Sequence, residues 1–489
     1  MKRACTLIHR EGRAPASPHF AFLFTLAGAL LAIVAGCAVG PNYQPPKMAV
    51  PAEFSNAGVT NYTTNHTVTL WWREFHDEEL NQLIERAVAS NHDLRIATVN
   101  LLQARALRLG AKAGYLPVVT GQASYSNEKF SRASQFGFVS PNRTEELYDL
   151  GFDSTWELDL FGHVRRGVEA ASEQVEATEA SRRDVLISLL SEVARNYFEL
   201  RGAQNELAVQ RRNADNQNQT LKITQARLEA GGGTELDVAR ARAQLDNTLA
   251  TIPLVESTML HAVHRLGVLL GRPPEALTDE LLPPAPIPTL PPAIDLGRPE
   301  DLLRRRPDIR VAERNLAAAT ANIGVAVSSL FPRVNFIGNI ALQGTSFSTI
   351  TGPASDSRTF GPSITWAALD LGHVRSAIKA AGAQADAQLA LYEKTVLTSL
   401  EETENSLVDY GRDRTRQDYL QQSVNDSRRA AELAHARYDS GAADFLSVLD
   451  AERVELEAED QLAQTQTQTA VALVAIYKAL GGGWEKPTP

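Results

Sequence analysis

The chain contains an internal duplication, and this repeat constrains its fold more than any other feature. Residues 156–165 read WELDLFGHVR, and residues 366–375 read WAALDLGHVR, 210 positions later. The same offset, or one of 215 upstream, aligns three further pairs of segments: 93–97 with 308–312, 115–117 with 330–332, and 226–231 with 436–441. This period is too long for a solenoid, so one structural unit is built twice. We therefore expect a two-fold-like architecture rather than a single pocket.

The first 36 residues have the pattern of a secretory signal. Four basic residues precede an apolar run at 20–35, which is short for a membrane span. The run ends in Val34-Ala35-Gly36-Cys37, and this spacing resembles a bacterial lipobox. It favours a lipidated Cys37 over an ordinary buried cysteine. The other cysteine, Cys5, lies in the leader, so we expect no disulfide and no cysteine-based metal site in the mature chain.

Charge and hydropathy exclude two classes of protein. The formal net charge is −10, which argues against nucleic-acid binding. After Cys37 no apolar stretch reaches the roughly 18 residues that a membrane helix needs. We therefore expect any membrane crossing to use β-strands.

Each repeat contains two segments in which apolar and polar residues alternate with period 2. They lie in the predicted β-hairpins at 116–160 and 332–370, and a polar tip at about 127–146 separates the first pair. One apolar face, one polar face and aromatic residues near the ends are typical of a membrane β-barrel. Taken singly, each strand fits a soluble sheet with one wet face better, but four such strands in a chain with a lipobox and no spanning helix favour the barrel.

Long proline-free stretches follow each β-hairpin and predict helical hairpins at 161–271 and 371–481. A first helix of about 69 residues spans roughly 100 Å and requires coiled-coil packing. Each hairpin turns at glycine, namely Gly231-Gly232-Gly233 in the first and Gly441 in the second. Residues 464–469 alternate Gln and Thr as a strand would, but the repeat places them in the returning helix.

The expected segments are a signal peptide (1–36), a lipid-anchored tether (37–75), helices of the two repeats (76–115 and 301–331), a linker too proline-rich for helix or inner strand (272–300) and a tail (482–489).

Four antiparallel strands cannot close a transmembrane barrel. An open edge in lipid leaves backbone groups unsatisfied at several kcal/mol each, and bacterial barrels have at least about eight strands. Two chains would give a narrow barrel filled by side chains. Three chains give about twelve strands and a wet lumen. We therefore expect an α+β membrane protein in which three chains share one 12-stranded β-barrel, with the long helical hairpins attached to it.

Several motifs together carry a family resemblance that covers essentially the whole mature chain. They are the lipobox with Gly40-Pro41-Asn42-Tyr43, Trp71-Trp72, residues 302–309 (LLRRRPDI), residues 330–332 (LFP), Asp370-Leu371-Gly372 and residues 437–441 (RYDSG). In this order they resemble the TolC/OprM-type outer-membrane efflux lipoproteins. The resemblance implies a homotrimeric duct in which a 12-stranded β-barrel in the bacterial outer membrane is continuous with a long α-helical barrel in the periplasm. It also implies a periplasmic adaptor and an inner-membrane resistance-nodulation-division pump as partners, and small toxic compounds such as drugs, dyes, detergents or metals as cargo.

The resemblance also implies a periplasmic gate at the hairpin tips. In the family a tyrosine on one hairpin holds an aspartate on the other, and apolar and acidic rings constrict the pore. By spacing these roles fall on Tyr438, Asp237, Leu446 and Asp450, and the turns at Gly231, Gly232, Gly233 and Gly441 would contact the adaptor. Ala443 and Ser447 depart from the latch arginine and second acidic ring of some relatives.

The sequence offers no catalytic or metal-binding constellation. His163 and His373 occupy equivalent repeat positions, which indicates a shared structural role. The glycines at 231–233 lack the Lys-Ser/Thr of a phosphate loop. We expect no enzyme activity and no cofactor beyond the lipid on Cys37. The alternatives to an efflux duct are a protein-secretion outlet and a lipid-anchored coiled-coil spacer.

Overall fold

The computed structural model describes residues 38–56, 62–63, 69–129, 131 and 144–484, which form two compact units. Unit 1 contains the chain up to Gln44, Ala106–Glu173 and Ala317–Asp386, and unit 2 contains the rest. Each unit thus takes segments from both repeats. The predicted signal, Cys37 and most of the first polar strand tip lie outside the described residues.

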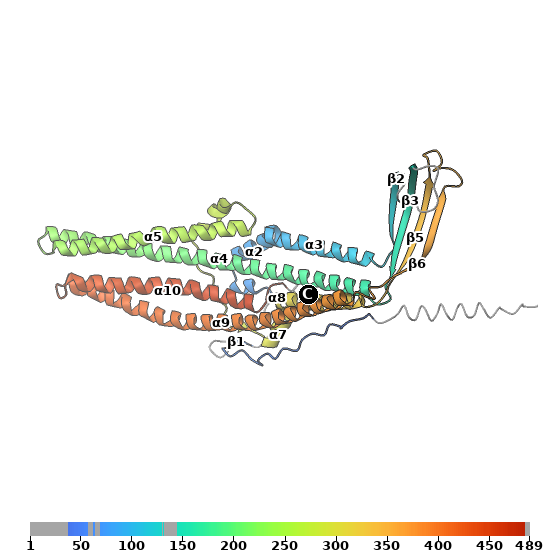
Figure 1. Cartoon of the computed structure of the whole chain (residues 1–489). Helices are drawn as coiled ribbons and strands as arrows, with labels where there is room; N and C mark the ends of the chain where they lie inside the picture. Colours follow the sequence, from blue (N-terminus) through green and yellow to red (C-terminus); the bar gives the residue numbers. More distant parts are fainter. Residues whose placement is uncertain (1–37, 57–61, 64–68, 130, 132–143, 485–489) are drawn as a thin grey trace, which may run out of the picture. The chain divides into compact units, whose positions relative to one another are not determined.

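A four-stranded antiparallel sheet dominates unit 1, and Figure 1 shows its strands side by side. The order is β2-β3-β5-β6. The strands span Val118–Lys129 (β2), Thr144–Leu158 (β3), Arg333–Gly344 (β5) and Asp356–Thr365 (β6). Within the described residues β2 pairs only with β3, and β6 pairs only with β5. The sheet therefore ends in two free edges in the single chain.

The register of the sheet separates apolar from polar side chains. Residues opposite one another share a face, so the pairs Phe152–Ile340 and Leu150–Leu342 lie on the same face. That face carries large exposed apolar groups: Val119, Leu150, Phe152, Trp156, Phe336, Ile340, Leu342, Phe360 and Ile364. On the opposite face the amide of Asn339 donates to Asp153 at 2.7 Å. The period-2 prediction is thus confirmed, although Val118 and Ile337 place apolar groups on the polar face.

The two repeats make the same anchoring contact at the base of the sheet. The indole nitrogen of Trp156 donates to the carbonyl of Tyr115 at 3.1 Å. The equivalent Trp366 donates to the carbonyl of Leu330, also at 3.1 Å. Each tryptophan ties the end of its second strand to the turn before its first strand, so the duplication is present in the contacts as well as in the sequence.

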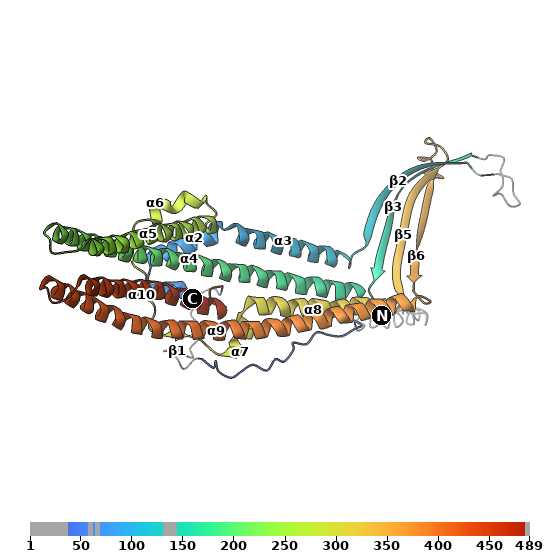
Figure 2. The same ribbon diagram turned by 60° about the vertical axis from the view of Figure 1, so that its left-hand side comes forward.

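Four long helices form two antiparallel hairpins, and Figure 2 shows α4 beside α5 and α9 beside α10. The helices span His163–Glu229 (α4), Glu235–Leu269 (α5), Leu371–Asp439 (α9) and Phe445–Ala479 (α10). The Gln-Thr alternation at 464–469 lies within α10, as the repeat predicts. The remaining helices of unit 2 or its boundary span Trp71–Phe75 (η1), Glu78–Ser90 (α2), His92–Ala113 (α3), Pro299–Arg305 (α7) and Pro307–Ser328 (α8).

The linker between the repeats is more ordered than its nine prolines indicate. It contains η3 (Pro274–Leu277), α6 (Thr278–Leu281) and β4 (Ile294–Asp295). β4 pairs in parallel with β1 (Tyr62–Thr63) from the predicted tether. The expectation that the linker excludes helix is therefore wrong, whereas β4 lies at the edge of a two-stranded sheet and agrees with the exclusion of an inner strand. Pro274 stands in the first turn of η3, where a missing N–H costs nothing, and Leu277 and Leu281 are fully buried.

An aromatic cluster forms the core of unit 2. Trp71 is fully buried and stacks on Tyr477, with ring centroids 5.1 Å apart. Phe75 meets Phe198 edge to face at 4.8 Å. The cluster joins η1, α4 and α10, so the Trp71-Trp72 motif supplies part of the core of unit 2. Among the described residues, no helix is long and apolar enough to cross a membrane.

Candidate functional site

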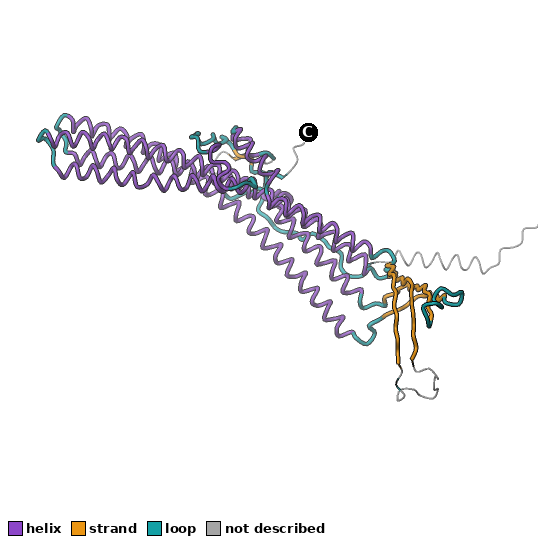
Figure 3. The backbone as a smooth tube through the Cα atoms, turned by 90° about the horizontal axis from the view of Figure 1, so that it is seen from above, coloured by secondary structure: helices purple, strands orange, loops and turns teal. Residues whose placement is uncertain are grey.

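The two hairpin turns lie side by side at one end of the four long helices (Figure 3) and form the candidate gate. In each hairpin a glycine with left-handed backbone follows the first helix, Gly231 after α4 (φ 77°) and Gly441 after α9 (φ 73°). In each turn the next residue donates its N–H back to an arginine carbonyl, Gly232 to Arg227 and Ala442 to Arg437, both at 2.8 Å. A side chain other than glycine would strain both turns.

The returning helices begin with matched caps. Thr234 caps α5, and its hydroxyl accepts from the backbone N–H of Asp237 at 3.2 Å. Asp237 in turn accepts from the hydroxyl of Thr234 at 2.7 Å. Asp444 caps α10 and accepts from the hydroxyl of Ser447 at 2.7 Å and from its N–H at 3.1 Å, and these hydrogen bonds lower the pKa of Asp444. The first turn is therefore fixed by reciprocal hydrogen bonds, and the second by two bonds from Ser447 to Asp444.

A small apolar cluster joins the two tips. Its buried members are Leu221, Val238, Ala241, Phe445 and Val448. Tyr438 packs against this cluster, with its ring 5.3 Å from that of Phe445. The first and second hairpins of one chain are thus in direct contact at their ends.

Arg227 adds a polar link between the hairpins, which sequence reasoning missed. Its guanidinium lies 4.1 Å from the centre of the Tyr438 ring. It also donates to the carboxylate of Asp439 at 3.0 Å and to the carbonyl of Tyr438 at 3.4 Å. Among the described residues, its equivalent in the second repeat, Arg437, donates to the carbonyl of Ala442 in its own turn at 3.5 Å. Arg227 and Arg437 occupy equivalent positions near the ends of their helices. The sequence alone therefore did not indicate which of the two arginines pairs with Asp439.

The four predicted gate residues lie on the tips but do not all meet. Within the described residues of one chain, the carboxylate of Asp237 accepts hydrogen bonds from Thr234, and the ring of Tyr438 makes a cation–π contact with Arg227. A latch between Tyr438 and Asp237 of neighbouring hairpins is not formed in the described part of the single chain and stays a prediction for the assembled protein. Leu446 is half exposed, and Asp450, one turn further on, is accessible and accepts from Arg453 at 2.9 Å.

A second candidate element holds the segment that follows Cys37. In unit 1 the buried Arg166 donates to the carbonyl of Val39 at 3.1 Å and to the side chain of Asn42 at 2.7 Å. Val39 also donates to the carbonyl of Phe161 at 3.2 Å. Gly40 has φ 91°, and a Cβ there would lie 2.5 Å from the Cα of Gly324. The Gly40-Pro41-Asn42 motif is thus built to dock the start of the described chain beside the end of β3.

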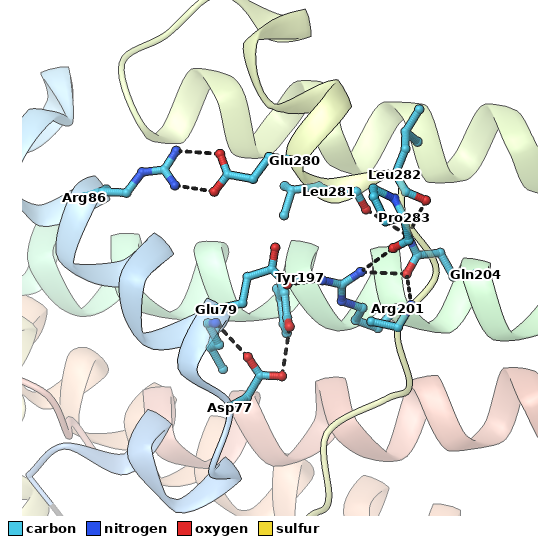
Figure 4. A network of polar contacts seen from close by, with 12 residues as sticks. Asp77, Glu79, Arg86, Tyr197, Arg201, Gln204, Glu280, Leu281, Leu282 and Pro283 are labelled. Carbon is cyan, nitrogen blue, oxygen red and sulfur yellow. Dashed lines mark hydrogen bonds and ion pairs between the residues drawn. The ribbon is translucent and has the colours of Figure 1, made fainter.

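A third element is a buried polar network in unit 2 (Figure 4). Arg201 of α4 donates to Glu79 of α2 and, at 2.8 Å, to Gln204. Gln204 donates to the carbonyl of Leu281 at 2.8 Å, which ties the linker to α4. Beside it the hydroxyl of Tyr197 donates to Asp77 at 2.9 Å, and burial raises the pKa of Tyr197. The network fastens α2 and the linker to the long helix.

Comparison with known proteins agrees with this architecture. A family model described as outer membrane efflux protein matches residues 83–272 and 299–482. Nodulation protein T of Rhizobium leguminosarum bv. trifolii is 31% identical, with 92% of this chain and 96% of that protein covered. The solvent efflux pump outer membrane protein SrpC of Pseudomonas putida is 32% identical, with 93% and 97% covered. Among solved structures, the outer-membrane channel OprN is similar with a TM-score of 0.86 and 44% identity, over 92% of this chain and 100% of that one.

Proposed function

Because the chain belongs to the outer membrane efflux protein family, we propose that three copies form one export duct. As a member of that family the chain is an outer-membrane efflux protein that extends into the periplasm, and it is not an enzyme. The family and its relatives' names favour efflux over a protein-secretion outlet or a coiled-coil spacer. The duct passively releases small toxic compounds, and solvents are the cargo named for one relative.

The proposal of a trimer rests mainly on the open sheet with one apolar face. Strands β2 and β6 each have one partner, so each leaves a row of backbone groups unpaired in the single chain. In a bilayer each unpaired group costs several kcal/mol. Pairing β6 of one copy with β2 of the next removes both edges, and three copies close a 12-stranded barrel. Its exposed apolar side chains, from Val119 on β2 to Ile364 on β6, would then meet lipid.

We expect the protein in detergent to contain three chains and to conduct. Native mass spectrometry should show three times the chain mass, and planar bilayers should show single-channel steps. Bilayers treated with the same detergent alone are the control. A conducting monomer or dimer would contradict the shared barrel, and a trimer that never conducts would contradict the duct.

We further propose that Cys37 carries a lipid and that a periplasmic adaptor docks on the hairpin tips. The hydrogen bonds from Arg166 to Val39 and Asn42 support a lipid on Cys37, because they hold residues 39–42 beside the end of β3. Gly231, Gly232, Gly233 and Gly441 form the tip surface offered to the adaptor. An inner-membrane pump of the resistance-nodulation-division type would supply the cargo.

The lipid is tested by mass. The mature protein should begin at Cys37 and be heavier than its sequence by the acyl groups. Cys37→Ala should abolish this increment and weaken retention in the membrane fraction. Cys5→Ala removes the other cysteine and should leave the increment intact. An unmodified Cys37 at the mature N-terminus would rule the anchor out.

Three copies of Asp450 around one axis would form an acidic ring that binds cations. The structure pairs each Asp450 with Arg453, whose guanidinium also donates to Glu457 at 2.8 Å. Asp450→Ala should therefore weaken block by divalent cations from the periplasmic side, and Arg453→Ala should strengthen it several-fold. Bilayer recordings with Mg²⁺ measure both. If neither variant shifts the block, Asp450 does not line the constriction.

A further inference from the structure

A polar cavity of about 670 Å³ lies between α4, α9 and α10 of unit 2. Gln217 and Thr220 line it from α4, His435 from α9, and Glu452 and Glu459 from α10. Both hairpins therefore contribute to its wall. It belongs neither to the tip contacts nor to the network of Figure 4.

The positive groups of this cavity are already paired. Arg212 of α4 donates to the buried Glu459 at 2.8 Å, and Asn213 donates to the same oxygen at 3.3 Å. Arg428 of α9 donates to Glu459 and, at 3.4 Å, to Glu455. Burial would raise the pKa of Glu459, but these hydrogen bonds outweigh it and lower the pKa. The two arginines therefore serve the cavity's own carboxylates and leave no site for an anion.

The unpaired groups of the cavity are hydrogen-bond acceptors. The side chain of Glu452 is only 10% exposed, and its Oε1 accepts from Thr220 at 2.8 Å and bonds His435 at 2.9 Å. Its Oε2 is buried without a partner. Gln217 is 5% exposed, and its Oε1 is also buried without a partner. Among the described residues that line the cavity, these two oxygens are the buried side-chain atoms without a hydrogen-bond partner.

We propose that this cavity binds a small organic cation with a protonated amine. An ammonium group has several N–H donors and no acceptor, so it is the kind of group that Glu452 Oε2 and Gln217 Oε1 would accept from once their side chains turn toward it, and its charge offsets the excess of carboxylates. A bare metal ion fits less well, because the described residues contain no cluster of three metal-ligating side chains suited to one. The volume admits a short alkyl chain beside the ammonium.

Such a ligand would join the two hairpins. Gln217 belongs to the first hairpin and Glu452 to the second, so one bound amine bridges α4 and α10. Bound ligand then favours the arrangement in which these helices are in contact, by mass action. The proposal rests on contacts within one chain and does not depend on how the strands assemble.

The test is calorimetric titration of the full-length protein in detergent at neutral pH with 1,4-diaminobutane. We expect saturable binding of one molecule per chain. The neutral analogue 1,4-butanediol has the same length and should not bind. Glu452→Gln keeps the size and one acceptor but removes the charge, and it should weaken binding at least about tenfold, the loss typical of a charged hydrogen bond.

Matched variants separate this site from general attraction of cations. Glu457→Gln removes the same charge from an exposed position of α10 and should leave the affinity unchanged. Gln217→Met keeps the side-chain length without an acceptor and should also weaken binding, which covers the case in which Glu452→Gln fails to fold. Equal affinities in Glu452→Gln and Glu457→Gln would overturn the proposal. So would the absence of saturable binding, which would mean that water fills the cavity.

Discussion

Replacing Glu79 by alanine is expected to lower the apparent melting temperature of the protein by several degrees. The side chain of Arg201 is 1% exposed, and Glu79 is the only carboxylate that the network gives it. Its other acceptors are the neutral oxygens of Gln204 and Pro283. Removing one partner of a buried ion pair typically costs about 3–5 kcal/mol. Glu79 itself is about one-third exposed, which places the expected loss near the lower figure, at about 3 kcal/mol.

Two further variants identify the cause of that loss. Glu280→Ala breaks the ion pair between Glu280 and Arg86. Their side chains are 42% and 29% exposed, so the variant should lose less than about 1 kcal/mol of stability. Adding Arg201→Met to Glu79→Ala removes the stranded charge and should recover part of the stability. Thermal unfolding followed by circular dichroism measures all three. Equal losses in Glu79→Ala and Glu280→Ala would show that Arg201 does not depend on its carboxylate.

Periodicity predicted the elements of this fold because their cause is local. The alternation from Val119 to Tyr125 and from Leu150 to Leu158 falls within β2 and β3. The repeat resolved the one ambiguous segment, at 464–469, because an equivalent helix constrains both copies. The family and its efflux function also followed from ordered motifs, and the family match confirmed them.

Contacts between distant segments could not be predicted in the same way. Arg201 and Glu79 lie 122 positions apart, and nothing in the local sequence of either residue indicates the other. The linker was misjudged because proline was counted without position, whereas Pro274 stands where a helix tolerates it. The role of Asp237 had a local signal that the resemblance obscured. Threonine three positions before a carboxylate is typical of a capping box, which is what the structure contains.

The hairpin tips give the second large prediction, in which Arg227→Met raises the fraction of time that a channel spends open and so the mean conductance of the bilayer. The guanidinium of Arg227 holds the Tyr438 ring and Asp439, which belong to the other hairpin. Both contacts are partly exposed, so together they contribute about 1 kcal/mol per chain. If three chains open together, about 3 kcal/mol changes the ratio of closed to open channels roughly a hundredfold. Arg437→Met is the matched control, because its contact stays within its own turn, and it should conduct like the wild type.

Variants of Tyr438 decide which bond holds the closed tips. Tyr438→Phe removes the hydroxyl but keeps the ring, so it should raise conductance only if a hydroxyl bond to Asp237 of a neighbouring chain is the latch. In that case the double variant with Asp237→Ala should add nothing further, because both changes break one bond. If Arg227 is the latch, Tyr438→Phe should conduct like the wild type, and Tyr438→Ala should match Arg227→Met. Since Asp237 also caps α5, Asp237→Asn separates its charge from its capping bonds. Wild-type conductance in Arg227→Met and Tyr438→Phe alike would place the gate away from these tips.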